Sequence, residues 1–103
     1  MGTAAEYVSL PARLVKPLPE NTSFVEGACF GIPAMTGYHA VHVAGPVAGK
    51  TVYVPGATGR VGAYAVQFAK WRGARVIAST GGGAAQIEAV RALGADVVLD
   101  RKA

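Results

Sequence analysis

The spacing of apolar residues changes along the chain and divides it near Lys50. After that residue, three short apolar runs alternate with two stretches in which apolar residues recur every three or four positions. The short runs are typical of strands and the wider spacing is typical of helices. The sequence therefore predicts a strand–helix–strand–helix–strand series, with strands over residues 51–54, 75–79 and 97–99 and helices over 59–71 and 84–93.

This alternation with short links predicts an α/β fold with three parallel strands in βαβαβ order. Connections between parallel strands are right-handed almost without exception. The strands are apolar at nearly every position, which is typical of a sheet covered on both faces. Three strands make only half of a doubly wound sheet.

The first half of the chain follows no single period. Residues 4–19 are interrupted by Pro11, Pro17 and Pro19, which neither a helix interior nor a central strand accepts. We expect short extended pieces there, resembling the edge of a β-structure.

A capping-box pattern follows, with Ser23 three residues before Glu26, and it predicts the start of a helix. Gly31 and Pro33 should break that helix, and a second short helix is expected over residues 35–43.

A glycine-rich turn lies between the first predicted strand and the first predicted helix of the series. Its residues are Gly56-Ala57-Thr58-Gly59-Arg60-Val61-Gly62. Small residues let the backbone approach a phosphate, and the helix N-terminus offers free N–H groups and a positive dipole end. We expect Gly59 to allow the approach to phosphate and Gly62 to let the helix lie close to the sheet. The turn and its context predict a partial Rossmann fold that binds a dinucleotide.

The end of the second strand bears on the choice of cofactor. NAD-binding members of this fold usually carry an acidic residue there, about 20 residues past the turn. This chain has Ser79, Thr80 and Gly81 instead, and its next carboxylate is Glu88. Because a carboxylate would repel a 2′-phosphate and none is present, NADP(H) is favoured over NAD(H). Ser79, Thr80 and the Gly81 amide are the candidate phosphate donors.

Composition narrows the possible partners. The chain has 103 residues and a net charge of +4, and its basic residues form no cluster or stripe. A nucleic-acid surface would need such a cluster with aromatic residues among it, and a bilayer span needs an apolar run of about 20 residues. We therefore expect no nucleic acid and no membrane as partner, and a cytoplasmic location.

A few other residues are possible sites with weaker support. His39 and His42 lack a third ligand at metal-binding spacing, so surface or packing roles are favoured. Cys29 has no evident acid/base partner and is expected to be a small buried residue. Trp71 is expected to pack at the end of its helix.

Several motifs, taken in order, resemble one superfamily of dehydrogenases. They are Ala5-Glu6-Tyr7-Val8, Pro17-Leu18-Pro19, Met35-Thr36-Gly37-Tyr38-His39-Ala40, the glycine turn preceded by Val54-Pro55, Ala65-Val66-Gln67-Phe68-Ala69-Lys70 and Leu93-Gly94-Ala95-Asp96. In order and spacing they are similar to the medium-chain dehydrogenase/reductase superfamily, and within it to the zinc-free quinone oxidoreductases of the ζ-crystallin-like branch.

The resemblance implies that the chain is a middle segment of a two-domain protein. Residues 1–21 would form the end of a GroES-like catalytic domain, as a β-containing N-terminal arm. Residues 22–103 would form the linking helices and the first half of the dinucleotide-binding domain.

The resemblance also implies roles for single residues. Thr36 matches the catalytic-site threonine that lies by the nicotinamide. Zinc-dependent members place a metal-binding cysteine where this chain has Ile32, so no metal site is expected. Gln86 takes the place of a lysine often found near the 2′-phosphate in these reductases, and Arg101 is the candidate cation in its stead.

The resemblance implies zinc-independent hydride transfer from NADPH to a small-molecule acceptor, a quinone or another activated C=C or C=O compound. Two alternatives stay open: an enoyl-thioester reductase of the same superfamily, and a non-catalytic nucleotide-binding fragment. The isolated chain is expected to be nearly inactive. The exposed edge of its incomplete sheet predicts association into a homo-oligomer.

Overall fold

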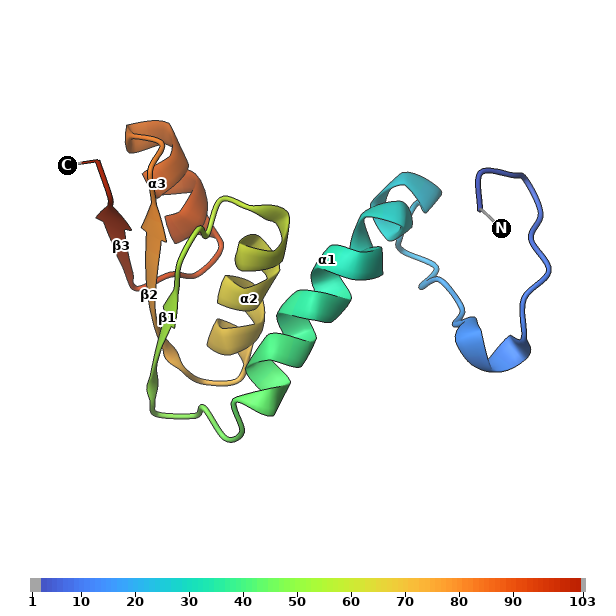
Figure 1. Ribbon diagram of the computed structural model, residues 1–103, viewed down its shortest axis with the longest axis horizontal. Coiled ribbons are helices and arrows are strands. Elements are labelled where there is room, and N and C mark those ends of the chain that lie inside the picture. Colours follow the sequence, from blue (N-terminus) through green and yellow to red (C-terminus); the bar gives the residue numbers. More distant parts are fainter. Residues whose placement is uncertain (1–2, 103) are drawn as a thin grey trace.

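The computed structural model describes residues 3–102 and contains the predicted alternating series (Figure 1). Met1, Gly2 and Ala103, which the expected domain ranges include, lie outside the described residues. Each strand and helix of the series begins and ends within one residue of its predicted bounds. The elements are η1 (Ala12–Leu14), α1 (Phe24–Val43), β1 (Thr51–Val54), α2 (Arg60–Trp71), β2 (Arg75–Thr80), α3 (Ala84–Ala92) and β3 (Val97–Asp100).

The three strands form one parallel sheet in the order β1-β2-β3. The register places Val52 opposite Val76 and Ala78 opposite Val98. These positions share the face on which the core lies, and Val76 and Ala78 are completely buried there. The predicted α/β fold with parallel strands is confirmed.

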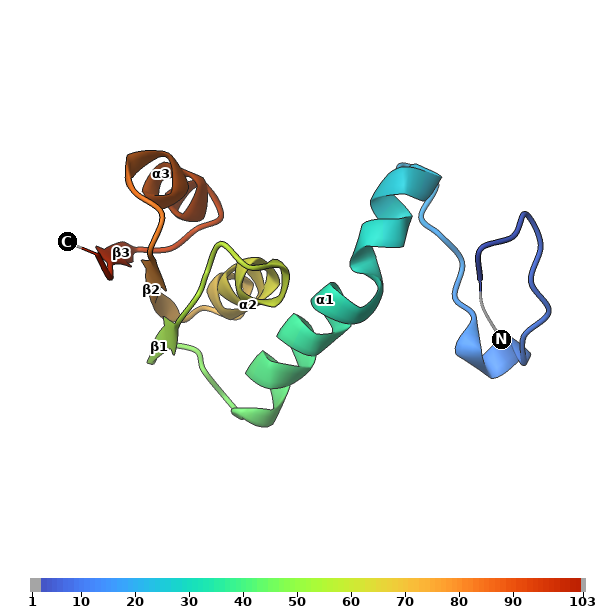
Figure 2. The same cartoon turned by 45° about the horizontal axis from the view of Figure 1, so that its top comes forward.

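Only one face of the sheet is covered in residues 3–102. Figure 2 shows α2 and α3 on the same side of the strands, and α1 packed on α2. On the other face Tyr53 and Leu99 are 56% and 49% exposed. The expectation of a sheet covered on both faces is not met within residues 3–102. Because two right-handed crossovers that step along the sheet in one direction place both helices on one face, the second face needs further elements.

The N-terminal arm differs from its prediction as a β-containing segment. Residues 3–22 contain the short helix η1 and no strand. Val15 has the extended backbone expected there, with φ −112° and ψ 139°. A strand also needs a neighbour for its backbone hydrogen bonds, and no such pairing is found for this arm within residues 3–102.

Helix α1 begins as predicted and bends as predicted. The Ser23 hydroxyl accepts a hydrogen bond from the Glu26 amide at 3.2 Å, and the Glu26 carboxylate accepts one from the Ser23 amide at 2.8 Å. Gly31 interrupts the helical backbone with φ −43° and ψ −115°. The two predicted helices are therefore the two arms of one kinked element.

None of the helices in residues 3–102 has the length and apolar character needed to cross a bilayer.

Asp96 connects three elements of the fold. One oxygen of its carboxylate accepts from the Lys70 ammonium of α2 at 2.6 Å, and the other accepts from the Val76 amide of β2 at 2.7 Å. The hydrogen bond from Lys70 and, to a lesser extent, the hydrogen bond from Val76 hold the pKa of Asp96 below its ordinary value. The charged carboxylate therefore holds the start of β3 against β2 and α2.

This arrangement predicts a loss of stability in acid. Because the folded-state pKa of Asp96 is lowered, the stability that its carboxylate contributes is complete above the pKa of a free aspartate, about 4. This stability is lost as the pH falls through the folded-state pKa. Asp96→Asn should lower the melting temperature at pH 7 and make it depend less on pH between about 7 and about 2. Glu88→Gln is the matched control, because Glu88 pairs only with Arg91 on the exposed side of α3. Equal pH profiles for Asp96→Asn and the unsubstituted chain would contradict this role.

Candidate dinucleotide-binding site

The glycine turn is closed by two backbone hydrogen bonds. Gly56 has a left-handed backbone, with φ +60°, and its carbonyl accepts from the Gly59 amide at 2.9 Å. The Ala57 amide donates to the Ser79 carbonyl at 3.0 Å, which attaches the turn to the end of β2. Ala57 is completely buried at this junction. The turn is thus continuous with β1 and bonded to β2.

Helix α2 approaches the turn so closely that side chains do not fit between them. A Cβ atom added to Gly62 would lie 2.5 Å from the Gly56 oxygen and 3.0 Å from the Ala57 Cα atom. A Cβ atom on Gly59 would lie 3.2 Å from the same oxygen. The role expected for Gly62, close packing of helix and sheet, agrees with this geometry.

The first turn of α2 leaves backbone amides free. Within residues 3–102, the amides of Arg60, Val61 and Gly62 have no hydrogen-bond partner, and the N-cap residue Gly59 supplies no side chain. The Gly59 amide is not free, because it donates to the Gly56 carbonyl. No acidic residue lies in this first turn. Free N–H groups at the positive end of a helix favour an anionic group.

A cavity of about 740 Å³ opens beside the turn, on the side of α1. Helix α2 contributes one face to it, with residues at the spacing i, i+3, i+4 and i+7, and α1 contributes the region of its kink. The lining residues are Ala28, Cys29, Phe30, Pro33, Thr58, Gly59, Arg60, Ala63, Tyr64 and Gln67. Cys29 was expected to be buried and is instead exposed at this cavity, as are most residues of α1 before Gly31.

Thr36 lies on the second arm of α1 and its side chain is exposed. The next residue, Gly37, is buried against α2, where an added Cβ atom would lie 2.9 Å from the Tyr64 Cβ atom. Pro33, one helical turn earlier, lines the cavity. The contact at Gly37 therefore fixes the position of Thr36 relative to α2.

The end of β2 lies on the other side of the turn. The Ser79 and Thr80 side chains are almost completely buried, at 1% and 0% exposure. The Ser79 hydroxyl is 2.9 Å from the Tyr53 hydroxyl, and the Thr80 hydroxyl donates to the Gln86 side-chain oxygen at 2.8 Å. The two hydroxyls among the candidate phosphate donors are thus engaged within the protein, and Ser79 also fixes the turn through its carbonyl.

Two cations lie over Gly81, directly after β2. A Cβ atom added to Gly81 would be 3.3 Å from Arg101 Nη2 and 3.7 Å from Lys102 Cε. The Arg101 amide donates to the Thr80 carbonyl at 2.8 Å, which fixes the start of this segment. Neither cation forms an ion pair within residues 3–102. Sequence reasoning selected Arg101 and missed Lys102, although the two are adjacent.

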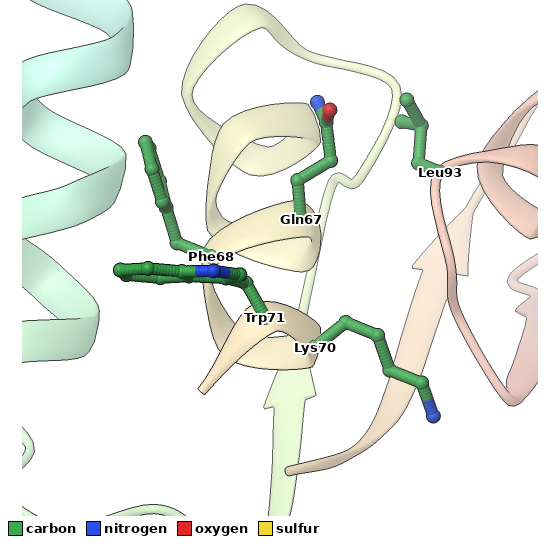
Figure 3. A pocket seen from close by; sticks show the side chains of 5 residues that line it. All are labelled: Gln67, Phe68, Lys70, Trp71 and Leu93. Atoms are coloured by element: carbon green, nitrogen blue, oxygen red, sulfur yellow. The ribbon is translucent and has the colours of Figure 1, made fainter. Parts of the chain in front are cut away.

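A second cavity, of about 540 Å³, lies on α2 away from the glycine turn. Figure 3 shows Phe68 and Trp71 pointing toward α1 and Lys70 pointing the other way. Trp71 was expected to pack at the helix end but is 77% exposed. Helix α1 crosses α2 at Gly37 and passes the Trp71 ring without covering it.

The two histidines do not come together with further ligands. His42 stacks on Tyr38, with ring centroids 5.9 Å apart, and both histidines are exposed. In the part of the chain that the structure describes, no three His, Cys, Asp or Glu side chains form a group that could hold a metal ion.

Fold and site together define the class, which is one half of a Rossmann-type dinucleotide-binding domain. Comparison with known proteins then gives the family. The chain is 36% identical over 100 residues to the 2-methylene-furan-3-one reductase of Solanum lycopersicum, a match that covers 96% of the chain and 26% of that protein. It is 41% identical over 81 residues to the quinone oxidoreductase of Homo sapiens, which covers 78% of the chain and 25% of that protein. The chain thus spans about a quarter of the length of these curated relatives.

Solved structures agree with these relatives. A quinone oxidoreductase from Thermus thermophilus, described together with its NADPH complex, superposes with a TM-score of 0.85 at 36% identity, over 94% of this chain and 32% of that one. An NAD-dependent alcohol dehydrogenase superposes with a TM-score of 0.90 at 38% identity, over 99% and 30%. No protein-family model matches the chain. The chain belongs to the medium-chain dehydrogenase/reductase superfamily, in its quinone oxidoreductase branch.

The close approach of α2 to the turn predicts the effect of a single methyl group. Gly62→Ala should destabilise the fold by about 1–3 kcal/mol, because the new Cβ atom forces the helix away from the Gly56 carbonyl. Gly59→Ala is the graded comparison: its Cβ atom meets the same oxygen at a longer distance and its φ of −70° suits alanine. Urea denaturation of the three chains measures both effects. Equal stability of Gly62→Ala and the unsubstituted chain would contradict the close packing.

Proposed function

We propose that the chain forms the cofactor-binding part of a zinc-independent, NADP(H)-dependent oxidoreductase of the quinone reductase type. The observation that carries this proposal is the set of free amides at Arg60, Val61 and Gly62, at the start of a helix that packs so closely on the glycine turn that Gly62 has no room for a Cβ atom. These amides would hold the diphosphate of the dinucleotide. The bound nicotinamide would supply the hydride, and the protein would orient it.

Charge at the end of β2 supports NADP(H) over NAD(H). In this fold the adenosine ribose lies at the end of the second strand, where Arg101 and Lys102 lie over Gly81. A 2′-phosphate brings negative charge to that place, and both cations lack an ion pair within residues 3–102. Ser79 and Thr80 contribute by fixing the glycine turn and the segment after β3 through their carbonyls, because their hydroxyls already have partners.

The position proposed for the nicotinamide rests on the family resemblance and on the cavity beside the glycine turn. With adenosine over β2, the other half of the dinucleotide extends to the α1 side of the turn, where the cavity of about 740 Å³ lies. Thr36 is the residue proposed to lie by the nicotinamide. Ile32, in place of the metal-binding cysteine of zinc-dependent members, supports hydride transfer without zinc.

The acceptor is proposed to be a quinone or another activated C=C or C=O compound. Names among the relatives support this class, since they include quinone oxidoreductase and 2-methylene-furan-3-one reductase. An enoyl-thioester reductase is the second candidate, and a relative named trans-enoyl reductase favours it. Both candidates require the same dinucleotide site in this chain.

The central test is binding of the reduced cofactors. NADPH and NADH are titrated against the fluorescence of Trp71 and against the emission of the nicotinamide itself, and NADPH should bind more tightly. Loss of NADPH absorbance is then followed with a quinone, and the isolated chain should show negligible turnover. Absence of binding by either cofactor would overturn the proposed site, whereas tight binding with robust turnover would exclude a non-catalytic fragment.

Arg101 provides a sharper test of the cofactor preference. Arg101→Ala should weaken NADPH binding about 3- to 10-fold, as expected for one exposed charge-assisted contact, and leave NADH binding unchanged. Arg91→Ala is the matched control, because it removes the same charge from the exposed side of α3. Equal weakening of NADPH and NADH by Arg101→Ala would contradict a contact with the 2′-phosphate.

A further inference from the structure

The kink of α1 leaves one backbone carbonyl without its regular donor. In an α-helix the carbonyl of Cys29 would accept from the amide four residues later. That residue is Pro33, which has no N–H group. The Tyr64 hydroxyl, from α2, donates to this carbonyl at 3.3 Å. A side chain of the neighbouring helix thus supplies the hydrogen bond that the proline removes.

Tyr64 is held in place for this contact. Its ring lies 6.3 Å from the Phe68 ring, at an interplanar angle of 25°. Its Cβ atom is in close contact with Gly37 on the second arm of α1. Tyr64 therefore touches α1 on both sides of the kink, through its Cβ atom beyond Gly31 and through its hydroxyl before it.

The kink itself offers a pivot. Gly31 has non-helical dihedral angles, and a Cβ atom added there would meet nothing within 4 Å. The second arm of α1 is fixed on α2 at Gly37, so a change at Gly31 would move the first arm, residues 24–30. The hydroxyl of Tyr64 bonds to that first arm.

The same hydroxyl bonds to a residue that lines the cavity beside the glycine turn. Cys29 and Phe30 of the first arm of α1 line that cavity together with residues 58–60 at the turn. Tyr64 lies one helical turn after Arg60, the residue with the first free amide of α2. The Tyr64 contact therefore links the first arm of α1 to the helix whose first amides form the proposed diphosphate site.

We propose that Tyr64 is a positioning residue: its hydroxyl holds the first arm of α1 at the width that accepts the nicotinamide half of the dinucleotide. This inference rests on the proposed function, because the cavity is assigned to that half only if the turn binds the diphosphate. The Tyr64 hydroxyl bonds to α1, whereas the two cations lie at the end of β2. Its influence is thus confined to one end of the cofactor.

Two probes separate the two ends. NADPH reports on the whole site, and 2′,5′-ADP reports on the adenosine end alone. Tyr64→Phe keeps the ring and removes the hydroxyl, so NADPH binding should weaken about 3- to 10-fold, the range of one hydrogen bond, with 2′,5′-ADP binding unchanged. Tyr38→Phe is the matched control on α1, because the Tyr38 hydroxyl has no hydrogen-bond partner in residues 3–102, and it should change neither affinity.

The outcomes distinguish the inference from the function on which it rests. If the unsubstituted chain binds neither probe, the proposed function and the positioning role of Tyr64 are both contradicted. If it binds both and Tyr64→Phe binds NADPH as the control does, only the positioning role falls. Equal weakening of both probes, accompanied by a lower melting temperature than that of Tyr38→Phe, would identify Tyr64 as a structural residue and also overturn the inference.

Discussion

The carbonyl of Gly56 is the contact on which the site depends. It accepts the hydrogen bond that closes the turn, and it faces Gly62 at a distance that leaves no room for a methyl group. Because α2 begins directly beside this carbonyl, its first amides lie at the turn and stay without protein partners among residues 3–102. A side chain at residue 62 would collide with this carbonyl and with the Ala57 Cα atom, so α2 could not keep its position at the turn. One steric constraint thus produces both the packing of the fold and the free donors of the site.

The glycine turn also separates the two ends of the proposed site. The end of β2, with Gly81 and the two cations beyond β3, lies on one side of it. The cavity shared with α1 lies on the other. The two ends differ in character, since one is defined by charge and the other by the width of a groove. This division explains why the cofactor preference and the fit of the nicotinamide are assigned to different residues.

Much of the fold follows from the sequence because its signals are local. The strand and helix bounds after Lys50, the capping box at Ser23 and the break at Gly31 all appear where the pattern predicts them. The predictions of a β-containing N-terminal arm and of a sheet covered on both faces are not met within residues 3–102, and both fail for the same reason. Pairing of strands and burial of a sheet face depend on partners that are far away in the sequence. A local pattern does not show which segments these partners are.

The sequence by itself determined the position and the chemistry of the glycine turn, because its steric demands are met by consecutive residues. It also placed the break of α1, since Gly31 and Pro33 act on the backbone beside them. Only the tertiary structure decided which group bonds to the Cys29 carbonyl at that break, because Tyr64 comes from another helix, 35 residues away. It likewise decided that Ser79 and Thr80 bond within the protein and that Lys102 joins Arg101 over Gly81. Contacts between elements are set by packing, and packing is a property of the folded chain.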